Sequence, residues 1–382
     1  MQIELPISKS IANRLLILQA IHGDGLMTVS ADLPADVQIL HNALTTLRTF
    51  KTFKTLSTPH IDVGNCGTAM RFLTAYCAQL EGQTTILDGV ERMHHRPIGQ
   101  LVDALREIGA DIEYLGDEGF PPLRIIGCAL DKHRIVTINN PQSTQFVSAL
   151  LLIGANVQTN STSPYITLTR TLIEQYALAS FTEDSATSVR RSGGNKISSV
   201  ENKINLDFVS EANRSPIFLE RDWSSAAFWY EYVALHGGEI TLPGLSRDSL
   251  QGDKVVADIF TNLGVHTTYT DEGVVISSSP LHPTPYTLHH DFSACPDLYP
   301  AIAIACERLG IELHATGVES LPLKESDRLR AVREHRTDAD HRMAMALLIA
   351  GYEVDDTACI SKSYPHFLDH FRRINSLKIQ EI

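Results

Sequence analysis

Apolar and polar positions recur along this chain in the order helix, glycine, strand and turn. The segments QLEGQTTILDG, ALHGGEITLPG and ERLGIELHATG each follow an apolar run typical of a helix. Each carries two glycines at the same interval, namely Gly82/Gly89, Gly237/Gly244 and Gly310/Gly317. We expect the first glycine of each pair to cap its helix, because glycine readily adopts the left-handed conformation found there. The residues between the glycines are expected to form a strand.

A second pattern of helix, glycine and strand occurs in DALREIGADIEY and DIFTNLGVHTTY. Asp103 precedes Gly109 by the same interval as Asp258 precedes Gly264. Units that recur on both sides of the midpoint predict duplicated α/β subdomains in two similar lobes, with a cleft between them. The polar segment 181–220 is the expected boundary, and a long surface loop inside one domain is the alternative.

Several predicted helices begin with small polar residues beside a cation. The segments are Ser8-Lys9-Ser10 with Arg14 one turn later, Asn65-Cys66-Gly67-Thr68 with Arg71, Arg96 before Pro97, Gln142-Ser143-Thr144-Gln145, Asp340 with Arg342, and Lys362-Ser363 before Pro365. A helix N-terminus offers unpaired N–H groups and about half a positive charge, so a cation there is best explained by an anion between them. One such start is more often a solvated cap, but together they predict convergence on a phosphorylated small molecule. Since neither a GxxxxGK[ST] loop nor a strand-linked GxGxxG occurs, a small phosphate ester is favoured over a nucleotide.

The composition narrows the classes of partner. The 382 residues carry a formal net charge of −13 and 43% hydrophobic residues, which is typical of a globular protein of two or three domains. Nucleic acids and membrane surfaces are polyanions, so this charge argues against general binding to either. The start MQIELPISKS lacks a basic segment followed by an apolar core, and no apolar run approaches about 18 residues, so we expect a soluble cytoplasmic protein.

Metal chemistry is not expected. The six cysteines are scattered without CxxC spacing, which favours reduced, mostly buried thiols. The adjacent pairs His94/His95 and His289/His290 face different directions, which disfavours a shared metal. Cys66, at a predicted helix start, is a candidate nucleophile, but a packing role is more common for such a cysteine.

Ten stretches between residues 6 and 367 carry the strongest signal when they are taken together. They are PISKSIANRLLIL, GNCGTAMRFLTAY, ERMHHRPIGQLVDALREIGADI, STQFVSALLL, SPYITLT, DWSSAAFWYE, CPDLYPAIAIA, LKESDRL, DHRMAMA and SKSYPHF. In this order they resemble the enolpyruvyl transferase family, and within it the 5-enolpyruvylshikimate-3-phosphate synthases. The match spans nearly the whole chain, and the joint pattern is highly specific.

The resemblance implies an α/β fold of two lobes, each built from repeated α/β subdomains with buried helices and outer sheets, an inside-out α/β barrel. We expect residues 8–220 to form the N-terminal lobe, on the shikimate 3-phosphate side. Residues 1–7 plus 221–382 are expected to form the C-terminal lobe, on the side of phosphoenolpyruvate and closure. No metal or organic cofactor is implied, and the expected partners of this monomer are the two small-molecule substrates alone.

The implied reaction belongs to chorismate and aromatic amino-acid biosynthesis. The 5-hydroxyl of shikimate 3-phosphate attacks C2 of phosphoenolpyruvate, and phosphate then leaves the tetrahedral adduct. The resemblance implies that Lys9 touches both substrates and shares proton transfer, and that Asp297 holds the attacking hydroxyl as base. Glu325 would exchange protons at the methylene, and His341 would support the same region. Because Glu325 and Lys9 would titrate together, neither is assigned sole ownership of the proton.

The resemblance also implies the substrate contacts. Phosphoenolpyruvate would be held by Arg96, Arg328, Arg342 and Lys362, with close backbone approach at Gly67 and the amide of Asn65. Shikimate 3-phosphate would meet Ser10, Arg14, Ser143, Thr144, Gln145, Thr162, Tyr165 and Lys324. Planar guanidinium groups suit both carboxylate and phosphate.

Two alternatives stay open. The sister enzyme that acts on UDP-N-acetylglucosamine carries asparagine after its first lysine and a reactive cysteine before its RPIG-like stretch. This chain has Ser10 at the first place and a loop, DGVERMHH, without cysteine. The other alternative is a degenerate relative that binds phosphorylated ligands without turnover, although every implied catalytic residue is present.

The chain departs from the family pattern in two ways. Cys66 and Phe72 stand where alanine and proline are common, which predicts a reshaped phosphoenolpyruvate pocket and an altered fit for the inhibitor glyphosate. The segment 177–220 matches poorly, and the helix begun at Asp327 passes through REHRT directly to Asp340, where a leucine-glycine stop and a hairpin are expected. Unrecorded residues, a real deletion or degeneration of the site would each account for this gap.

Overall fold

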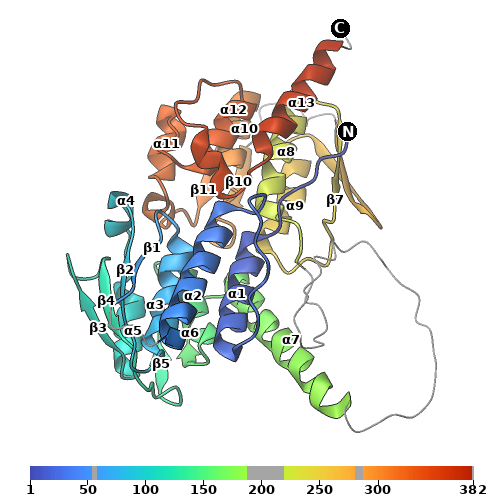
Figure 1. The fold of residues 1–382 in the computed structure, drawn as a ribbon. Coiled ribbons are helices and arrows are strands. Elements are labelled where there is room, and N and C mark those ends of the chain that lie inside the picture. The colour runs from blue at the N-terminus through green and yellow to red at the C-terminus, as the bar shows by residue number, and fades with distance from the viewer. Residues whose placement is uncertain (54–57, 187–218, 280–286, 381–382) are drawn as a thin grey trace.

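A computed structural model describes residues 1–53, 58–186, 219–279 and 287–380 (Figure 1). Most of the predicted boundary segment, residues 187–218, therefore lies outside the described residues. Buried apolar side chains form two separate clusters. The first core gathers residues between Ile7 and Leu219, and the second gathers Ile3, Leu5 and residues between Trp223 and Ile374.

The elements around the first core alternate between helices and short strands. The helices are α1 (Lys9–His22), α2 (Ala35–Phe53), α3 (Gly67–Ala78), α4 (Glu91–His94), α5 (Gly99–Glu107), α6 (Thr144–Leu152) and α7 (Pro164–Ala186). One sheet has the order β1-β2-β4-β3, from β1 (His60–Asp62), β2 (Thr84–Asp88), β4 (Leu123–Ile126) and β3 (Asp111–Tyr114). A second, parallel pair joins β5 (Ile135–Thr137) to β6 (Asn156–Gln158).

The elements around the second core follow the same alternation. The helices are α8 (Trp223–His236), α9 (Val256–Thr261), α10 (Tyr299–Leu309), α11 (Arg328–Glu334), α12 (His341–Ile349) and α13 (Phe367–Gln380), with short turns η1 (Gly252–Val255), η2 (Leu321–Leu323) and η3 (Ala358–Lys362). The sheets are β7-β9-β8, from β7 (Glu239–Pro243), β9 (Gly273–Ser278) and β8 (Val265–Thr270), and the parallel pair β10 (Thr287–Asp291) and β11 (Glu312–Thr316).

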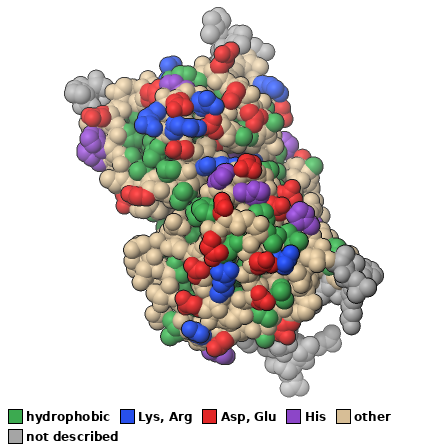
Figure 2. Space-filling view, turned by 90° about the vertical axis from the view of Figure 1, so that its left-hand side faces the viewer, with side chains coloured by type: hydrophobic (Ala, Val, Ile, Leu, Met, Phe, Trp, Pro, Cys, Tyr) green, Lys and Arg blue, Asp and Glu red, His purple; other side chains and the backbone are tan. Residues whose placement is uncertain are grey.

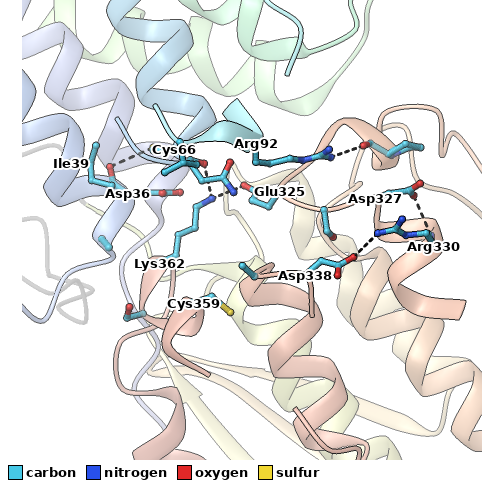
Figure 3. Close-up of a pocket in the computed structure, with 17 residues that line it drawn as sticks. Asp36, Ile39, Cys66, Arg92, Glu325, Asp327, Arg330, Asp338, Cys359 and Lys362 are labelled. Atoms are coloured by element: carbon cyan, nitrogen blue, oxygen red, sulfur yellow. Dashed lines mark hydrogen bonds and ion pairs between the residues drawn. The ribbon is translucent and has the colours of Figure 1, made fainter. Parts of the chain in front are cut away.

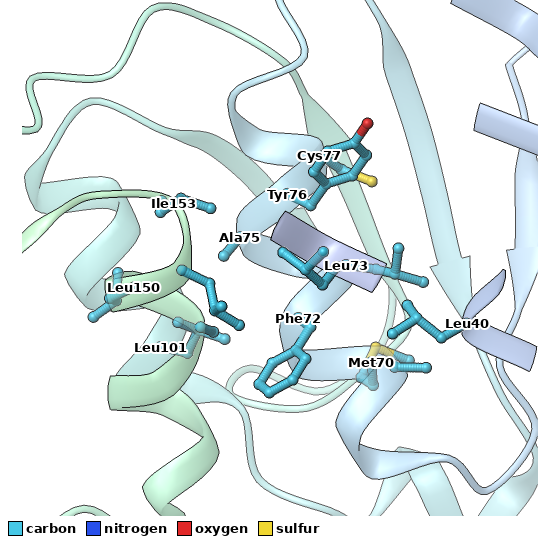
Figure 4. Close-up of a cluster of buried hydrophobic side chains, with 14 of the residues drawn as sticks. Leu40, Met70, Phe72, Leu73, Ala75, Tyr76, Cys77, Leu101, Leu150 and Ile153 are labelled. Atoms are coloured by element: carbon cyan, nitrogen blue, oxygen red, sulfur yellow. The ribbon is translucent and has the colours of Figure 1, made fainter. Parts of the chain in front are cut away.

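Helices fill the interior of both halves, and the sheets lie outside. Every residue of α1 from Ile11 to Ala20 is buried, as is every residue of α8 from Trp223 to Val233. Strands such as β3 and β4 alternate between buried and exposed positions, as expected where one face meets solvent. Around α3, side chains from α2, α5 and α6 close on one another in the first core (Figure 4). A helix that is apolar on all sides is stable only when it is surrounded, which explains this arrangement.

The glycine repeats predict the strands well and the helix ends less well. The strands β2, β7 and β11 lie between the paired glycines as predicted. Gly237 and Gly310 cap α8 and α10, each with a φ of 69°. The prediction for Gly82 is wrong, because α3 already ends at Ala78 with Gln79 as its cap, and Gly82 lies in the following turn.

Two crossing segments link the halves and pair with each other. Ile7 forms an antiparallel bridge with Arg221, flanked by hydrogen bonds from the Ser8 amide to the Glu220 carbonyl at 2.8 Å and from the Asp222 amide to the Pro6 carbonyl at 3.0 Å. Within the part of the chain that the structure describes, no helix combines the length and apolar character that a membrane span requires.

The connection between α11 and α12 is short. His335, Asp338 and Ala339 adopt positive φ values of 51°, 45° and 57°, which are uncommon for residues other than glycine. The described residues contain no hairpin between the two helices, so β10 and β11 stay a two-stranded sheet, whereas β1 and β2 are extended by β4 and β3. The leucine-glycine stop and the hairpin that the internal repeat leads one to expect here are therefore absent from the described residues.

Candidate active site

A cleft of about 700 Å³ lies between the two halves of the molecule. Its walls contain most of the residues implied by the resemblance, namely Lys9, Ser10, Arg14, Gly67, Arg96, Ser143, Thr144, Gln145, Thr162, Tyr165, Asp297, Lys324, Glu325, Arg328 and Arg342. Asn65 and Lys362 instead line an adjoining cavity of about 810 Å³, and Asp36 and Glu325 belong to both walls. On the surface, cationic, histidine and acidic side chains gather at the constriction between the halves (Figure 2).

The predicted convergence of helix N-termini is confirmed for four of the predicted helix starts, those of α1, α3, α6 and α12. First-turn residues of α1, α3, α6, α11 and α12 all line the cleft. Several of the predicted caps are also confirmed: the side chains of Cys66, Ser143 and Asp340 accept from backbone amides of the first turn. The N–H groups and the positive ends of these helices favour anions in the space between them.

Two predicted helix starts need correction. α5 begins at Gly99 after Ile98, so Pro97 is not its first helical residue, and the backbone from Arg96 to Ile98 is irregular. α13 begins at Phe367 rather than near Pro365, because the preceding residues form the turn η3 and an irregular link. In both cases the proline is treated as the first residue of the helix. Tertiary contacts instead make the helix begin two residues after the proline.

Asp297 is held by three cations on the second half of the chain. Its carboxylate accepts from Arg328 Nη1 at 2.9 Å and from Arg342 Nη2 at 2.8 Å, and Lys324 Nζ lies 3.5 Å away. Burial alone would raise the pKa of Asp297, but Arg342, Lys324 and Arg328 together hold it well below its usual range. Asp297 is therefore an ionised carboxylate.

Glu325 forms the wall between the cleft and the adjoining cavity. Its oxygens accept from Lys362 Nζ at 3.0 Å and from Arg328 Nη2 at 3.1 Å, and Lys362 also donates to the Asn65 carbonyl at 2.9 Å. Figure 3 shows Lys362 extending toward Glu325. Burial opposes ionisation of Glu325, but Lys362, Arg96 and Arg328 hold its pKa well below the usual range. Each of the two carboxylates is thus placed beside cations that an incoming anion could attract.

Gly67 and the guanidinium groups near it form a narrow anion site. A Cβ on Gly67 would collide with Arg71 Nη1 and would lie 2.5 Å from Arg96 Nη2, so a side chain there would force these guanidinium groups to move. Arg96 donates to the carbonyl and the side-chain oxygen of Asn65 at 3.1 and 3.2 Å. Arg71 keeps Nε and Nη1 buried without a partner among the described residues, which leaves donors for a ligand.

Two site residues escaped the sequence-based site prediction. Asp36, at the start of α2, accepts from Lys9 Nζ at 3.2 Å, and its side chain is only 4% exposed. Arg71 lies one turn into α3, and this position beside Gly67 was a signal that the site prediction left unused. For Asp36 no local motif exists, because its pairing with Lys9 depends on the packing of α2 against α1.

Arg14 has a more structural position than the resemblance implies. Its guanidinium donates to Thr169 Oγ1 at 2.7 Å, to the Ser10 carbonyl at 2.7 Å and to Ser148 Oγ at 3.1 Å. Burial lowers the pKa of Arg14 to about 10. The residue fixes α1 against α6 and α7 and thereby positions Ser10 at the edge of the cleft.

Cys66 is a packing residue and not a nucleophile. It is fully buried at the cap of α3, where Sγ accepts from the Ala69 amide at 3.4 Å. Burial, and then the nearby charge of Asp36, raise the pKa of the Cys66 thiol to about 12. A thiol with so high a pKa is not a nucleophile at neutral pH.

His341 lies behind the cleft wall and does not line the cleft. The ring is 0% exposed, neither nitrogen has a hydrogen-bond partner among the described residues, and Asp340 Oδ1 is 3.7 Å from Nδ1. Burial, followed by the charges of Lys9, Arg342 and Lys362, lowers the pKa of His341 well below 6.5. A neutral imidazole in this place can support the neighbouring cations without adding to their charge.

The neutral state of His341 predicts a pH-dependent stability. Below about pH 6.5 the unfolded chain takes up a proton that the folded ring refuses, so acid favours unfolding. As the pH falls below about 6.5, we expect this residue to lower the free energy of unfolding by about 1.4 kcal/mol for each pH unit. Urea unfolding of the native chain and of His341→Gln between about pH 5.5 and 7.5 measures the difference, and equal slopes in the two proteins would contradict the prediction.

Comparison with known proteins gives one consistent result. The sequence matches the family described as EPSP synthase (3-phosphoshikimate 1-carboxyvinyltransferase) over residues 1–335 and 333–371. A 3-phosphoshikimate 1-carboxyvinyltransferase of Bacteroides fragilis is 36% identical, with 97% of this chain and 94% of the relative covered. One from Cellvibrio japonicus is 31% identical, with 98% and 96% covered. A solved EPSP synthase of Acinetobacter baumannii has a TM-score of 0.60 at 20% identity, covering 98% of this chain and 95% of that one, and confirms the predicted fold.

The same comparisons mark where the chain is short. The alignment with the Bacteroides fragilis relative runs over 419 positions, more than the 382 residues of this chain, so the relative has segments without a counterpart here. The match to the family divides at residues 333–335, which are the end of α11 and the first residue of the link to α12. The shortening inferred from the internal repeat and the division of the family match thus fall on the same segment.

Proposed function

Because this chain belongs to the EPSP synthase family, we propose that it transfers the enolpyruvyl group of phosphoenolpyruvate to the 5-hydroxyl of shikimate 3-phosphate and releases phosphate. The observation that carries this proposal is the cleft itself. Helix N-termini and cations from both halves surround two ionised carboxylates, Asp297 and Glu325. This is the combination that an addition–elimination between two phosphorylated anions requires.

The proposed proton transfers follow from how the carboxylates are paired. Arg342, Lys324 and Arg328 hold the pKa of Asp297 too low for an effective base. The phosphate and carboxylate of phosphoenolpyruvate would draw these guanidinium groups away, so the pKa of Asp297 would rise as the substrate binds. Asp297 would then accept the 5-hydroxyl proton as the oxygen attacks C2, and the Lys9–Glu325 region would protonate C3. Loss of a C3 proton and of phosphate from the adduct would complete the exchange.

The substrate contacts are proposed on the same basis. The guanidinium groups of Arg96, Arg328 and Arg342, with Lys362, Asn65 and Gly67, would hold phosphoenolpyruvate. The remaining polar residues of the cleft would hold shikimate 3-phosphate: Ser10, Arg14, Ser143, Thr144, Gln145, Thr162, Tyr165 and Lys324. Their support is that all of them except Asn65 and Lys362 line the one cleft, and that these two line the adjoining cavity, which shares Asp36 and Glu325 with the cleft.

The lobes and the setting complete the proposal. We assign residues 8–220 to an N-terminal lobe and residues 1–7 plus 221–382 to a C-terminal lobe, supported by the two separate cores and by the paired crossing at Ile7 and Arg221. We propose that the chain acts as a cytoplasmic monomer without nucleic-acid or membrane partners. A single chain supplies every proposed site residue, and its net charge of −13 repels both polyanions.

The decisive test is phosphate release from shikimate 3-phosphate plus phosphoenolpyruvate, with Lys9→Ala as the inactive control. We expect release by the native chain and none above background by the variant. Tight binding of both ligands without release by the native chain would favour a non-catalytic binder. Release only with UDP-N-acetylglucosamine as acceptor would favour the sister activity.

We also propose that glyphosate competes for the phosphoenolpyruvate site with an altered fit. Phe72 is a residue of α3 whose ring is buried in the first core rather than in the cleft wall (Figure 4). The Arg14 guanidinium lies 5.5 Å from its ring centre. Phe72 and the cap Cys66 would thus act by shifting the start of α3, where Gly67 lies. The double variant Cys66→Ala, Phe72→Pro should give a measurably different inhibition constant, and identical inhibition curves would refute this expectation.

A further inference from the structure

The two lobes meet at a contact in which the residues of the C-terminal lobe have no assigned role in the site. Gly252 and Asp253, in η1 of the second half, lie against Pro164 and Tyr165 at the start of α7 in the first half. A Cβ on Gly252 would be 2.6 Å from Pro164 Cβ, so the backbones approach as closely as glycine allows. Leu250, just before η1, packs against the first core. The segment 250–253 of the C-terminal lobe is thus fitted to the N-terminal lobe.

Asp253 is the polar centre of this contact. Asp253 is only 2% exposed, and its Oδ1 accepts a hydrogen bond from the Tyr165 hydroxyl of the other lobe at 3.1 Å. The other oxygen, Oδ2, accepts from Ser224 Oγ in the first turn of α8. Because one carboxylate oxygen is bonded to each lobe, the carboxylate is fixed in a single orientation.

Tyr165 lines the cleft, and its hydroxyl has Asp253 as its one hydrogen-bond partner among the described residues. Burial, and then the charges of Asp253 and Asp297, raise the pKa of Tyr165 well above its ordinary value, so the side chain stays a phenol and donates its proton. The backbone carbonyl of Tyr165 accepts from Arg14 Nη2 at 3.3 Å. The ring is therefore anchored by its own lobe through the backbone and by the opposite lobe through the hydroxyl.

We propose that Asp253 is a positioning residue that orients Tyr165 for shikimate 3-phosphate and so couples the occupied acceptor site to the C-terminal lobe. This inference rests on the proposed function, in which Tyr165 contacts that substrate. Asp253 does not line the cleft and acts only through Tyr165. Loss of a hydrogen bond to a buried charged group weakens an interaction by a factor of about 10 to 100, which sets the scale of the effect.

The test is a double-mutant cycle with Asp253→Asn, Tyr165→Phe and the combined variant. Dissociation constants for shikimate 3-phosphate come from calorimetry, and KM for each substrate and kcat come from phosphate release. We expect each single change to raise the dissociation constant and KM for shikimate 3-phosphate about 10-fold, with KM for phosphoenolpyruvate changed less than about 3-fold. The combined variant should bind no more weakly than Tyr165→Phe alone, because Asp253 acts through that hydroxyl.

Two further variants keep the test decisive. Ser224→Ala leaves the carboxylate in place but frees one of its oxygens, so it should shift the same constant in the same direction by a smaller factor. Asp258→Asn removes an exposed charge on the following helix and should leave all constants unchanged. Native affinity in Asp253→Asn, or effects of Asp253→Asn and Tyr165→Phe that multiply, would overturn the inference. A native chain that neither binds shikimate 3-phosphate nor releases phosphate would instead overturn the proposed function.

Discussion

Glu325→Gln should lower kcat for phosphate release by roughly 10²- to 10⁴-fold, the range typical of a lost acid–base group. Glutamine keeps the shape of the side chain but cannot exchange a proton with the C3 methylene. It also removes a negative charge between Lys362 and Arg328, at 3.0 and 3.1 Å, so the site becomes more cationic. The KM for phosphoenolpyruvate should therefore stay the same or fall. Initial rates of phosphate release against each substrate measure both constants.

The matched control is Glu334→Gln, on the exposed side of the adjacent helix α11. Glu334 lies 3.8 Å from Arg330, and its side chain is 48% exposed, so its charge is screened by water. We expect native constants in this variant. If Glu325→Gln kept more than about a tenth of native kcat, Glu325 would be a binding residue at most, and another group would have to move the proton.

The parts of the site that the sequence predicts are those decided locally. A helix cap depends on one side chain and an amide two residues later, so Ser143 and Asp340 could be recognised from a few neighbouring letters. The strands β2, β7 and β11 are equally local, since paired glycines bound each of them. The expected roles of the site residues come from the resemblance to the family. The ten motifs indicate a common fold, and a common fold would place the matching residues at matching positions.

The parts that the sequence does not predict depend on packing between distant segments. Lys9 and Asp36 meet only because α1 lies against α2, and Tyr165 and Asp253 meet only across the two lobes. The depth of His341 behind the cleft wall is also set by surrounding helices and not by its own motif. The predicted start of α5 at Pro97 is wrong for a related reason. A proline is compatible with the start of a helix but does not determine where the helix begins.

The short link between α11 and α12 makes one buried acid unusually important. The link holds His335, Asp338 and Ala339 at positive φ, a conformation that costs of order 1 kcal/mol or more for such residues unless contacts hold it. Asp340 follows immediately and supplies such contacts. It accepts from Arg328 Nε at 2.8 Å and from the Arg342 amide at 2.9 Å, and it is 0% exposed.

Asp340→Asn should lower the free energy of unfolding by about 1.5–3 kcal/mol, the usual cost of losing a buried hydrogen bond between charged groups. Asparagine caps helices about as well as aspartate, so the α12 cap is kept and the lost charge dominates the effect. Arg328 would keep its contacts to Asp297 and Glu325 but lose the carboxylate at its Nε. Urea unfolding at neutral pH measures the difference.

Asp338→Asn is the matched control for that measurement. Asp338 pairs with Arg330 and Arg336, each at 3.1 Å, but the side chains of both arginines are at least half exposed. Asparagine tolerates the positive φ at this position, and exposed ion pairs contribute at most about 1 kcal/mol, so the control should unfold nearly as the native chain does. Equal losses in the two variants would mean that the link as a whole limits stability. If only Asp340→Asn loses stability, the buried ion pair between Asp340 and Arg328 accounts for the loss. The same pair would then hold the guanidinium group that is proposed to bind phosphoenolpyruvate.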